Sequence, residues 1–172
     1  MLKNHDLSTE ERQVHEYWMN RAIELAEQAA AIGEVPIGAI VVKDNQIIGQ
    51  AYNLREKTMR ATAHAELMAI EDANQRSNAW RLEGASLYVT LEPCPMCAGA
   101  IINARLKEVI YGASDPKAGC AGSLCNLLED TRFNHQPQVI SGIHTEKTGQ
   151  LLSDFFQNLR QTKKSYKQSV DK

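Results

Sequence analysis

Apolar residues recur near the start of the chain at steps of three and four positions, which is the spacing of one face of an α-helix. Within residues 11–32, the positions on this spacing are Val14, Trp18, Ala22, Leu25, Ala26 and Ala29. Gly33 follows where glycine most often ends a helix. The pattern therefore predicts an amphipathic helix over 11–32 that packs one face on a core.

Shorter apolar runs separated by turn residues predict the remaining elements. Strands are expected at 37–42, 46–52, 86–91, 108–111 and 139–143, and further helices at 63–74, 95–105 and 151–164. Asp44-Asn45 is suited to join the first two strands in a hairpin, and Thr62 is suited to cap the helix at 63–74. Strands that alternate with helices favour one α/β domain over 1–172, with helices on both faces of a sheet.

Composition excludes few classes of protein. The 172 residues are 43% hydrophobic and 23% charged, which is typical of a globular chain. No apolar stretch approaches the roughly 20 residues that span a bilayer, and the polar start at 1–12 is unlike a signal peptide. We therefore expect a soluble, cytoplasmic protein with no membrane partner. In such a protein, four cysteines favour metal or redox chemistry over disulfides.

Charge is distributed unevenly, although the formal net charge is only −2. Residues 160–172 contain five basic residues and one acidic residue, which leaves the rest of the chain at −6. A basic tail of this kind attracts phosphates even when the body of the protein is acidic. It can equally be a solubilising tail, so charge alone does not decide for a nucleic-acid partner.

Two short segments, each at the start of a predicted helix, carry residues with metal chemistry. One is Ala63-His64-Ala65-Glu66 and the other is Pro93-Cys94-Pro95-Met96-Cys97. Two cysteines three positions apart at a helix start can aim both sulfurs at one point, and the helix dipole favours thiolates there. A histidine nitrogen adds a third ligand, so His64, Cys94 and Cys97 are predicted to bind zinc.

Three protein ligands leave one coordination position open, as in catalytic zinc sites. A water molecule in that position has its pKa lowered toward about 7. Glu66 is then predicted to move protons without binding the metal, from the water to a ring nitrogen and to a departing amine. His-x-Glu followed by Pro-Cys-x-x-Cys is the established signature of zinc-dependent nucleobase deaminases.

Two other interpretations of the cysteines remain open at this point. The 94–97 pair could join Cys120 and Cys125 in a closed four-cysteine zinc site, although the spacing of the second pair is wider than usual. The 94–97 pair could also be a redox pair, which would leave the His-x-Glu motif without a role. If the chain is a deaminase, Cys120 and Cys125 are ordinary buried or loop cysteines.

With these motifs the chain resembles the cytidine deaminase-like superfamily and, within it, the bacterial tRNA-specific adenosine deaminases. The resemblance extends from about Tyr17 to Lys164. Outside the zinc motifs it includes Gly33–Ala39, Asn53, Leu91–Cys94, Met96–Ile101, Tyr111–Lys117, Gly122-Ser123, Phe133–His135 and Leu152–Phe156. The chain departs from the family at Ala61, where proline is frequent, and in its loop cysteines, and neither departure changes a ligand.

The resemblance implies a three-layer α/β/α sandwich with a mixed five-stranded sheet. It implies a homodimer with one zinc ion per subunit, whose interface helps to shape an RNA site. The implied reaction is hydrolytic deamination of adenosine to inosine at the wobble position of a tRNA anticodon, chiefly in an arginine tRNA. The partner of the site would be the anticodon stem-loop.

The resemblance also implies a pocket for a base that has left its stack. Asn53 would hydrogen-bond the flipped base, and Val35, Pro36 and Ile37 would help to form the pocket. Without the resemblance, Asn53 could simply end a strand, since asparagine is frequent in turns.

Other residues would contact RNA around the target base. Asp115 and Lys117 would contact the flanking nucleotides, although Asp115 could instead be a turn residue. Phe155, Phe156 and Arg160 would lie on the C-terminal helix that handles the anticodon loop. We expect one of the two phenylalanines to lie in the core.

Two rival functions share part of these features. A free-base or nucleotide deaminase, such as guanine or cytosine deaminase, would use the same zinc motifs but gives no reason for the 115–117 loop or the basic tail. Turnover of tRNA against free bases separates it from the leading hypothesis. A non-catalytic zinc-binding or RNA-binding module would bind zinc and release no ammonia from any substrate.

Overall fold

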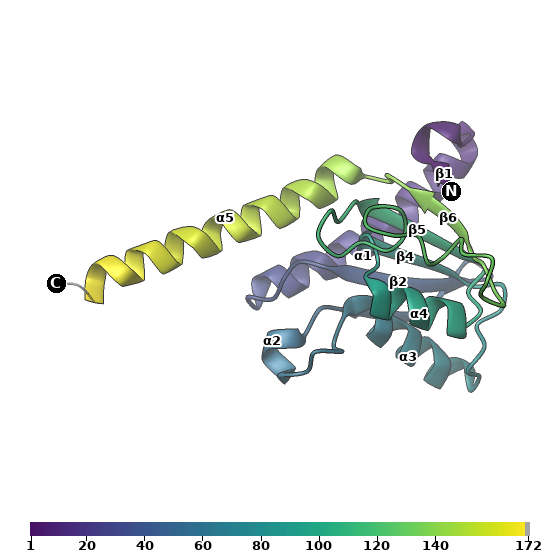
Figure 1. The fold of residues 1–172 in the computed structure, drawn as a ribbon, viewed down its shortest axis with the longest axis horizontal. Helices are drawn as coiled ribbons and strands as arrows, with labels where there is room; N and C mark the ends of the chain where they lie inside the picture. Colours follow the sequence, from purple (N-terminus) through teal and green to yellow (C-terminus); the bar gives the residue numbers. More distant parts are fainter. Residues whose placement is uncertain (171–172) are drawn as a thin grey trace.

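The protein is an α/β structure built on a six-stranded sheet (Figure 1). It is described from a computed structural model, which covers residues 1–170 apart from the side chains of residues 163 and 166–170. The strands are β1 (Leu2–Lys3), β2 (Gly38–Lys43), β3 (Gln46–Tyr52), β4 (Ser86–Leu91), β5 (Glu108–Ala113) and β6 (Gln138–Ser141). The helices are a 3-10 turn η1 (Asn4–Asp6), then α1 (Thr9–Ala31), α2 (Arg55–Thr58), α3 (Ala65–Ser77), α4 (Pro95–Asn103) and α5 (Thr145–Val170).

The sheet is mixed, with strand order β1-β6-β5-β4-β2-β3. Pairing is parallel from β1 through to β4, and β2 is antiparallel to both of its neighbours. Figure 1 shows α3 and α4 on one face of the sheet and α1 on the other, which confirms the three-layer arrangement. The expected strand count of five was one short, because the two-residue strand β1 at the polar N-terminus has no apolar pattern and forms only by pairing with β6.

Two separate cores lie on the two faces of the sheet, because successive side chains of a strand point in opposite directions. The core under α1 takes from the strands Ile40, Val42, Tyr88, Ile110 and Ile140. The core under α3 and α4 takes the alternate set, which includes Ala39, Val41, Leu87, Val89 and Val109. Central strands are therefore apolar on both faces.

Helix α1 confirms the prediction from apolar spacing and adds detail that the spacing missed. Ser8 and Glu11 form a reciprocal capping box, in which each side chain bonds the backbone N–H of the other residue. Val14 was expected on the buried face and is exposed, whereas Met19 is fully buried. Gly33 follows the helix with φ of 82°, as expected for a residue that ends one.

Helix α5 is longer than the predicted 151–164, because its first turns are polar and carry no apolar periodicity. Its C-terminal half extends beyond the sheet layers (Figure 1). Phe156 is 40% exposed and neither phenylalanine belongs to a core, so the expectation that one of them is buried was wrong. Of the predicted basic tail, Arg160 and Lys164 are exposed on α5, and residues 171–172 lie outside the described residues.

Within residues 1–170, every helix is too short or too polar to cross a lipid bilayer.

Gly38 should be required for α1 to lie on the sheet. A Cβ at this position would fall 2.1 Å from Ala22 O and 2.6 Å from Ala26 N, both backbone atoms that cannot rotate away. We expect Gly38→Ala to lower the free energy of unfolding by about 3 kcal/mol, measured by urea denaturation. The matched control is Gly149→Ala in α5, where nothing lies within 4 Å. It should raise stability by about 0.5–1 kcal/mol, and equal effects of the two variants would contradict this account.

Candidate active site

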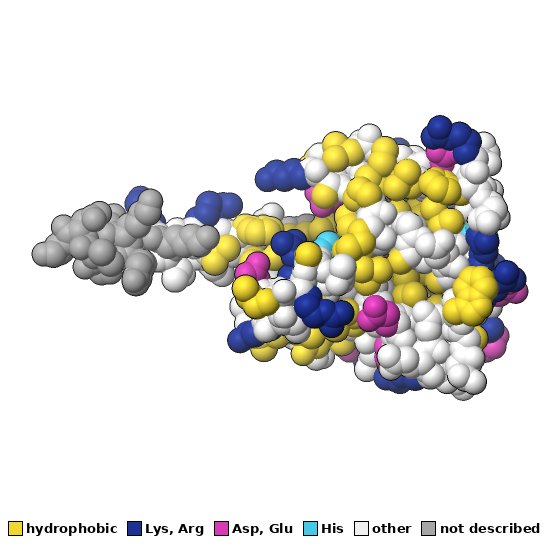
Figure 2. Space-filling model, turned by 60° about the horizontal axis from the view of Figure 1, so that its bottom comes forward, with side chains coloured by type: hydrophobic (Ala, Val, Ile, Leu, Met, Phe, Trp, Pro, Cys, Tyr) yellow, Lys and Arg dark blue, Asp and Glu magenta, His cyan; other side chains and the backbone are white. Residues whose placement is uncertain are grey.

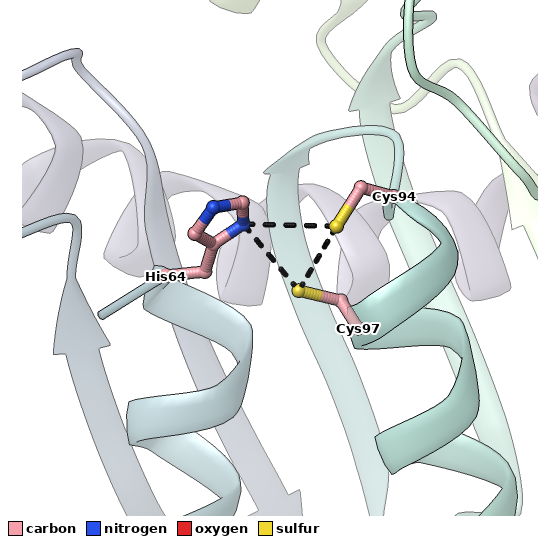
Figure 3. A group of neighbouring side chains, drawn as sticks. All are labelled: His64, Cys94 and Cys97. Atoms are coloured by element: carbon pink, nitrogen blue, oxygen red, sulfur yellow. Dashed lines mark hydrogen bonds between the residues drawn. The ribbon is translucent and has the colours of Figure 1, made fainter. Parts of the chain in front are cut away.

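The two predicted metal segments meet where α3 and α4 begin, side by side on one face of the sheet. His64 is the N-cap residue of α3, and Cys94 is the N-cap residue of α4 with Cys97 one turn further on. Figure 3 shows the imidazole reaching across from the start of α3 toward the two sulfurs on α4. Residues 30 positions apart in the chain thus form one group.

Local sequence explains why these helices start where they do. Pro95 occupies the first turn of α4, where its missing N–H has no helical partner to lose. Thr62 was expected to cap a helix that begins at residue 63. The helix α3 instead begins at Ala65, and His64 takes the cap position. The His64 side chain makes no capping bond, since its imidazole is turned toward the thiols. The N-termini of α3 and α4 both direct positive partial charge toward the His64, Cys94 and Cys97 side chains.

The three side chains form a nearly equilateral triangle of ligand atoms. His64 Nδ1 lies 3.7 Å from Cys94 Sγ and 3.6 Å from Cys97 Sγ, and the two sulfurs are 3.6 Å apart. Nitrogen and sulfur atoms that converge in this way could hold a metal ion. Among the described residues, this is the one group of three or more such side chains close enough to share an ion.

The two thiols are electrostatically unlike. The contact with Cys97 lowers the pKa of the Cys94 thiol to about 4, while the same contact, with burial, raises the pKa of the Cys97 thiol. One sulfur is therefore readily a thiolate, and a second thiolate at 3.6 Å is opposed by like charge. A cation between the sulfurs removes that opposition, which is what a metal supplies.

Glu66 lies in the first turn of α3, next to the ligand group. The residue is only 4% exposed, and its Oε2 atom has no hydrogen-bond partner among the described residues. Burial raises the pKa of this carboxyl, so it binds a proton more readily than an exposed glutamate. A buried carboxylate oxygen without a partner beside a metal-ligand group is suited to proton transfer.

The predicted base-pocket residues come together beside the ligands. The Asn53 N–H donates to Ile37 O at 2.9 Å, which joins the segment Val35, Pro36 and Ile37 to the end of β3. The next residue, Leu54, donates to the carbonyl of Ala63, immediately before His64. Asn53 is buried, which is unlike an asparagine that merely ends a strand in a surface turn.

Asn53 is held by a residue to which the sequence analysis gave no role. Its Nδ2 donates to Glu34 Oε2 at 3.0 Å, and Glu34 Oε1 accepts from the backbone N–H of Lys57 at 2.6 Å. Glu34 is fully buried. The amide of Asn53 is thereby fixed with nitrogen toward Glu34. In the sequence, Glu34 stands out only as a charged residue between the end of a predicted helix and an apolar strand.

The loop after β5 lies against the Cys94 segment. The Cys120 N–H donates to Pro93 O at 2.8 Å, and the Asp115 N–H donates to Glu92 Oε2 at 2.9 Å. Asp115 Oδ1 accepts from the N–H of Lys117, so it also shapes its own turn. Asp115 and Lys117 thus lie in a loop that is hydrogen-bonded to the segment just before Cys94. Glu92 is a second buried residue for which the sequence predicted no role.

Phe155, Phe156 and Arg160 lie together on α5, and no hydrogen bond between described residues joins them to the ligand group. The C-terminal half of α5 extends beyond the sheet layers (Figure 1). Phe155 and Phe156 stack edge to face at 5.4 Å between ring centroids. Any contact of these residues with a substrate in the site requires a ligand that reaches from the site to the helix.

Cys120 and Cys125 do not complete a four-cysteine cluster. Cys120 is buried and Cys125 is exposed, and neither belongs to the group that could hold a metal. They are a buried and a loop cysteine, as expected for a deaminase. Among the described residues, the structural-zinc alternative therefore has no cluster to support it.

Comparisons with known proteins agree with this geometry. The sequence profile of the MafB19-like deaminases matches residues 13–160. The tRNA-specific adenosine deaminase of Bacillus subtilis strain 168 is 52% identical over 155 residues, which cover 90% of this chain and 96% of that protein. The fold and the site thus define a deaminase. The chain belongs to the family of tRNA-specific adenosine deaminases.

Solved structures give the same result. A tRNA:A34 deaminase, studied for A-to-I editing at the wobble position of transfer RNA, is 40% identical with a TM-score of 0.76, over 79% of this chain and 99% of that one. A guanine deaminase from Bacillus subtilis is 41% identical with a TM-score of 0.57, over 63% of this chain and 70% of that one. The fold is thus similar to that of deaminases with different substrates.

Removing any one ligand should empty the metal site. We expect His64→Ala, Cys94→Ser and Cys97→Ser each to lower the bound metal, measured by atomic emission on purified protein, from about one per chain to near zero. Binding should also weaken as pH falls, because protons compete for the imidazole nitrogen and the sulfurs.

The matched control for these variants is Cys125→Ser, which changes an exposed cysteine outside the group. It should leave the metal content unchanged. Full metal binding by Cys97→Ser would contradict the ligand assignment.

Proposed function

We propose that the protein is a zinc-dependent hydrolase that converts adenosine to inosine at the wobble position of a tRNA anticodon, chiefly in an arginine tRNA. The observation that carries the proposal is the His64, Cys94 and Cys97 triangle with the buried Glu66 beside it. The tRNA substrate is supported by the family, since the relative that is 52% identical is named a tRNA-specific adenosine deaminase. A tRNA substrate also implies that the enzyme acts in the cytoplasm.

Zinc fits the ligand triangle without rearrangement. Zn–S bonds of about 2.3 Å and Zn–N bonds of about 2.0 Å in a tetrahedron put two sulfurs about 3.8 Å apart, and sulfur and nitrogen about 3.5 Å apart. The three separations here are 3.6, 3.6 and 3.7 Å. Three ligands from one side leave the fourth position open, which supports a catalytic ion, one per chain, over a structural one.

Glu66 is the proposed proton carrier of the reaction. When bound, zinc polarises a water molecule and lowers its pKa toward about 7. The unpartnered Oε2 of Glu66 would accept one proton from the attacking water and give it to a ring nitrogen, which keeps it in inosine. It would then carry the proton of the new hydroxyl group to the amine that leaves as ammonia. The raised pKa of this carboxyl supports the first half of the transfer, because a weaker acid accepts a proton more readily. The departing amine is basic enough to take the proton back from the protonated carboxyl.

The base is proposed to lie between Asn53 and the segment 35–37. Glu34 occupies one N–H of the Asn53 amide, which leaves its Oδ1 and the second N–H to pair with a base. Val35 and Ile37 are partly exposed and offer apolar surface for a base that has left its stack. Pro36, which is buried, holds this segment in place.

Nucleotides around the target are proposed to contact the 115–117 loop and α5. Asp115 and Lys117 lie in the loop that is hydrogen-bonded to the segment just before Cys94, and both are at least partly exposed. Phe155, Phe156 and Arg160 offer stacking surface and a positive charge along α5, and an anticodon stem-loop is large enough to reach both. Because phosphate contacts release counterions, binding should weaken as salt concentration rises.

We also propose that residues 1–172 act as one deaminase domain and that two copies form a homodimer. A family match over 13–160 and a single sheet support the first. Large apolar side chains in water support the second, because monomers rarely expose contiguous apolar patches. Met59 is 86% exposed, Trp80 63% and Leu124 61%. Figure 2 shows hydrophobic side chains gathered over much of one face.

Incubation with an arginine tRNA that has an ACG anticodon should produce inosine at the wobble position, which reverse transcription reads as guanosine. Glu66→Ala should lower this conversion at least about 100-fold and keep its zinc, because the carboxylate moves protons and binds no metal. Sequencing of the tRNA and metal analysis measure the two effects.

The matched control is Glu71→Ala, which removes an exposed glutamate from the same helix and should change neither readout. Ammonia released from free guanine or cytosine, with no change in tRNA, would keep the metal chemistry and overturn the substrate. Full conversion by Glu66→Ala would overturn the proton-transfer role.

The homodimer predicts a particle mass twice that of one chain. Size-exclusion chromatography with light scattering on the zinc-loaded protein measures it directly. A mass of one chain at micromolar concentrations would contradict the proposed assembly and leave the assignment of the reaction untouched.

A further inference from the structure

A buried carboxylate lies between the metal ligands and the loop that follows β5. Glu92 directly precedes Pro93-Cys94, and it is only 2% exposed. Its backbone N–H donates to Ala113 O at 2.9 Å, so the residue bridges the ends of β4 and β5. The mechanism uses none of its atoms.

All the acceptor positions of this carboxylate are occupied by the loop. Oε1 accepts from the backbone N–H of Ala121 at 3.0 Å and of Ser123 at 2.9 Å. Oε2 accepts from the backbone N–H of Asp115 at 2.9 Å and from the Ser123 hydroxyl. A carboxylate has about four lone-pair sites, and here four donors fill them.

No cation balances the charge of Glu92. In the described part of the chain, no Lys, Arg or His nitrogen lies within 4.0 Å of its oxygens. A buried charge of this kind is tolerated only because hydrogen-bond donors replace water around it. The loop and the carboxylate therefore depend on each other, because the loop N–H groups and the Glu92 oxygens are each other's hydrogen-bond partners.

The loop is also shaped to admit this side chain. A Cβ on Gly119 would lie 2.3 Å from Glu92 Cδ, so only glycine lets the backbone pass so close. Cys120 N–H donates to Pro93 O, which adds a second tie to the ligand segment. Asp115, once held by Glu92, accepts from the N–H of Lys117. A continuous set of hydrogen bonds thus runs from the Cys94 segment to the loop surface.

We propose that Glu92 is a positioning residue, which sets the distance between the metal ligands and the residues Asp115 and Lys117 that meet nucleotides beside the target. The RNA part of this inference rests on the proposed function. The loop part does not, because the hydrogen bonds exist without a substrate. Glu92 acts through the loop and touches no reacting atom.

Glu92→Gln should break one of the three backbone N–H hydrogen bonds to this side chain and keep the other two. The donors on Oε1 are both backbone N–H groups, which cannot reverse, so the glutamine oxygen has to stay there. The new NH2 group then takes the Oε2 position, where the Ser123 hydroxyl can rotate to accept but the Asp115 N–H cannot. The variant thus selectively frees Asp115, one of the residues proposed to contact RNA.

Hydrogen exchange of the zinc-loaded protein, followed by NMR, tests the loop part. In the unaltered protein the amides of Asp115, Ala121 and Ser123 should exchange at least about 100-fold slower than in an unstructured peptide. In Glu92→Gln the Asp115 amide should exchange at least about tenfold faster, with the Ala121 and Ser123 amides changed less than about threefold.

Kinetics on an anticodon stem-loop test the RNA part. Glu92→Gln should raise KM about tenfold, with kcat within about threefold and zinc content unchanged. The matched control is Asp130→Asn, which removes the charge of a half-buried carboxylate between β5 and β6 whose oxygens are bonded by Arg132 and not by Glu92's partners, and it should change neither parameter.

Unprotected amides in the unaltered protein, or an Asp115 amide unaffected by Glu92→Gln, would overturn the positioning role. A loss of zinc or of kcat alone would also overturn it, because Glu92 would then act on the ligands. If Glu92→Gln does not fold, exchange in the unaltered protein still decides the loop part. If the unaltered protein makes no inosine, the proposed function fails while the exchange result stands by itself.

Discussion

The site depends on one constraint, which is that two helix N-termini must converge on a single point. Helices α3 and α4 start beside each other on one face of the sheet, so His64 meets Cys94 and Cys97 with ligand atoms 3.6–3.7 Å apart. Two sulfurs this close repel each other as thiolates, and the helix dipoles and a cation relieve the repulsion. The rest of the fold holds this arrangement: β2, β4 and β5 carry the core on which both helices lie.

Three buried glutamates around this point differ in their hydrogen bonds, and the roles proposed for them follow from that difference. Glu66 keeps an oxygen without a partner and is free to exchange a proton. Glu34 is occupied by Asn53 and by Lys57 N–H, and Glu92 by four donors from one loop. A saturated carboxylate holds its neighbours in place, whereas an unsaturated one reacts. The proposed reactive and positioning roles are thus divided among chemically identical side chains.

Helix α5 carries apolar side chains that no other part of the described chain covers. Phe156 and Leu159 are exposed on a helix that extends beyond the sheet layers (Figure 1). An amphipathic helix with no apolar partner gains little stability from its apolar side. The proposed RNA and the proposed second subunit each provide a surface of the kind that this side lacks.

Much of the local structure followed from the sequence, because it depends on neighbours in the chain. Apolar spacing predicted α1 and the central strands, and Asp44-Asn45 predicted the hairpin turn, where both residues have positive φ. The motifs at 64–66 and 93–97 predicted the group of side chains that the fold brings together, since this combination of residue types suits one chemistry. The role of Glu66 as proton carrier stays a prediction. Resemblance to the family supplied Asn53 and the loop residues.

Tertiary structure decided what depends on residues far apart in the chain. Strand β1 exists only through β6, Val14 and Phe156 are exposed although their spacing favours burial, and Thr62 yields the cap position to His64. The sequence offers no periodicity or motif from which the buried positions of Glu34 and Glu92 follow. Their partners lie 19 to 31 positions away, and only folding shows which carboxylate oxygens are left free.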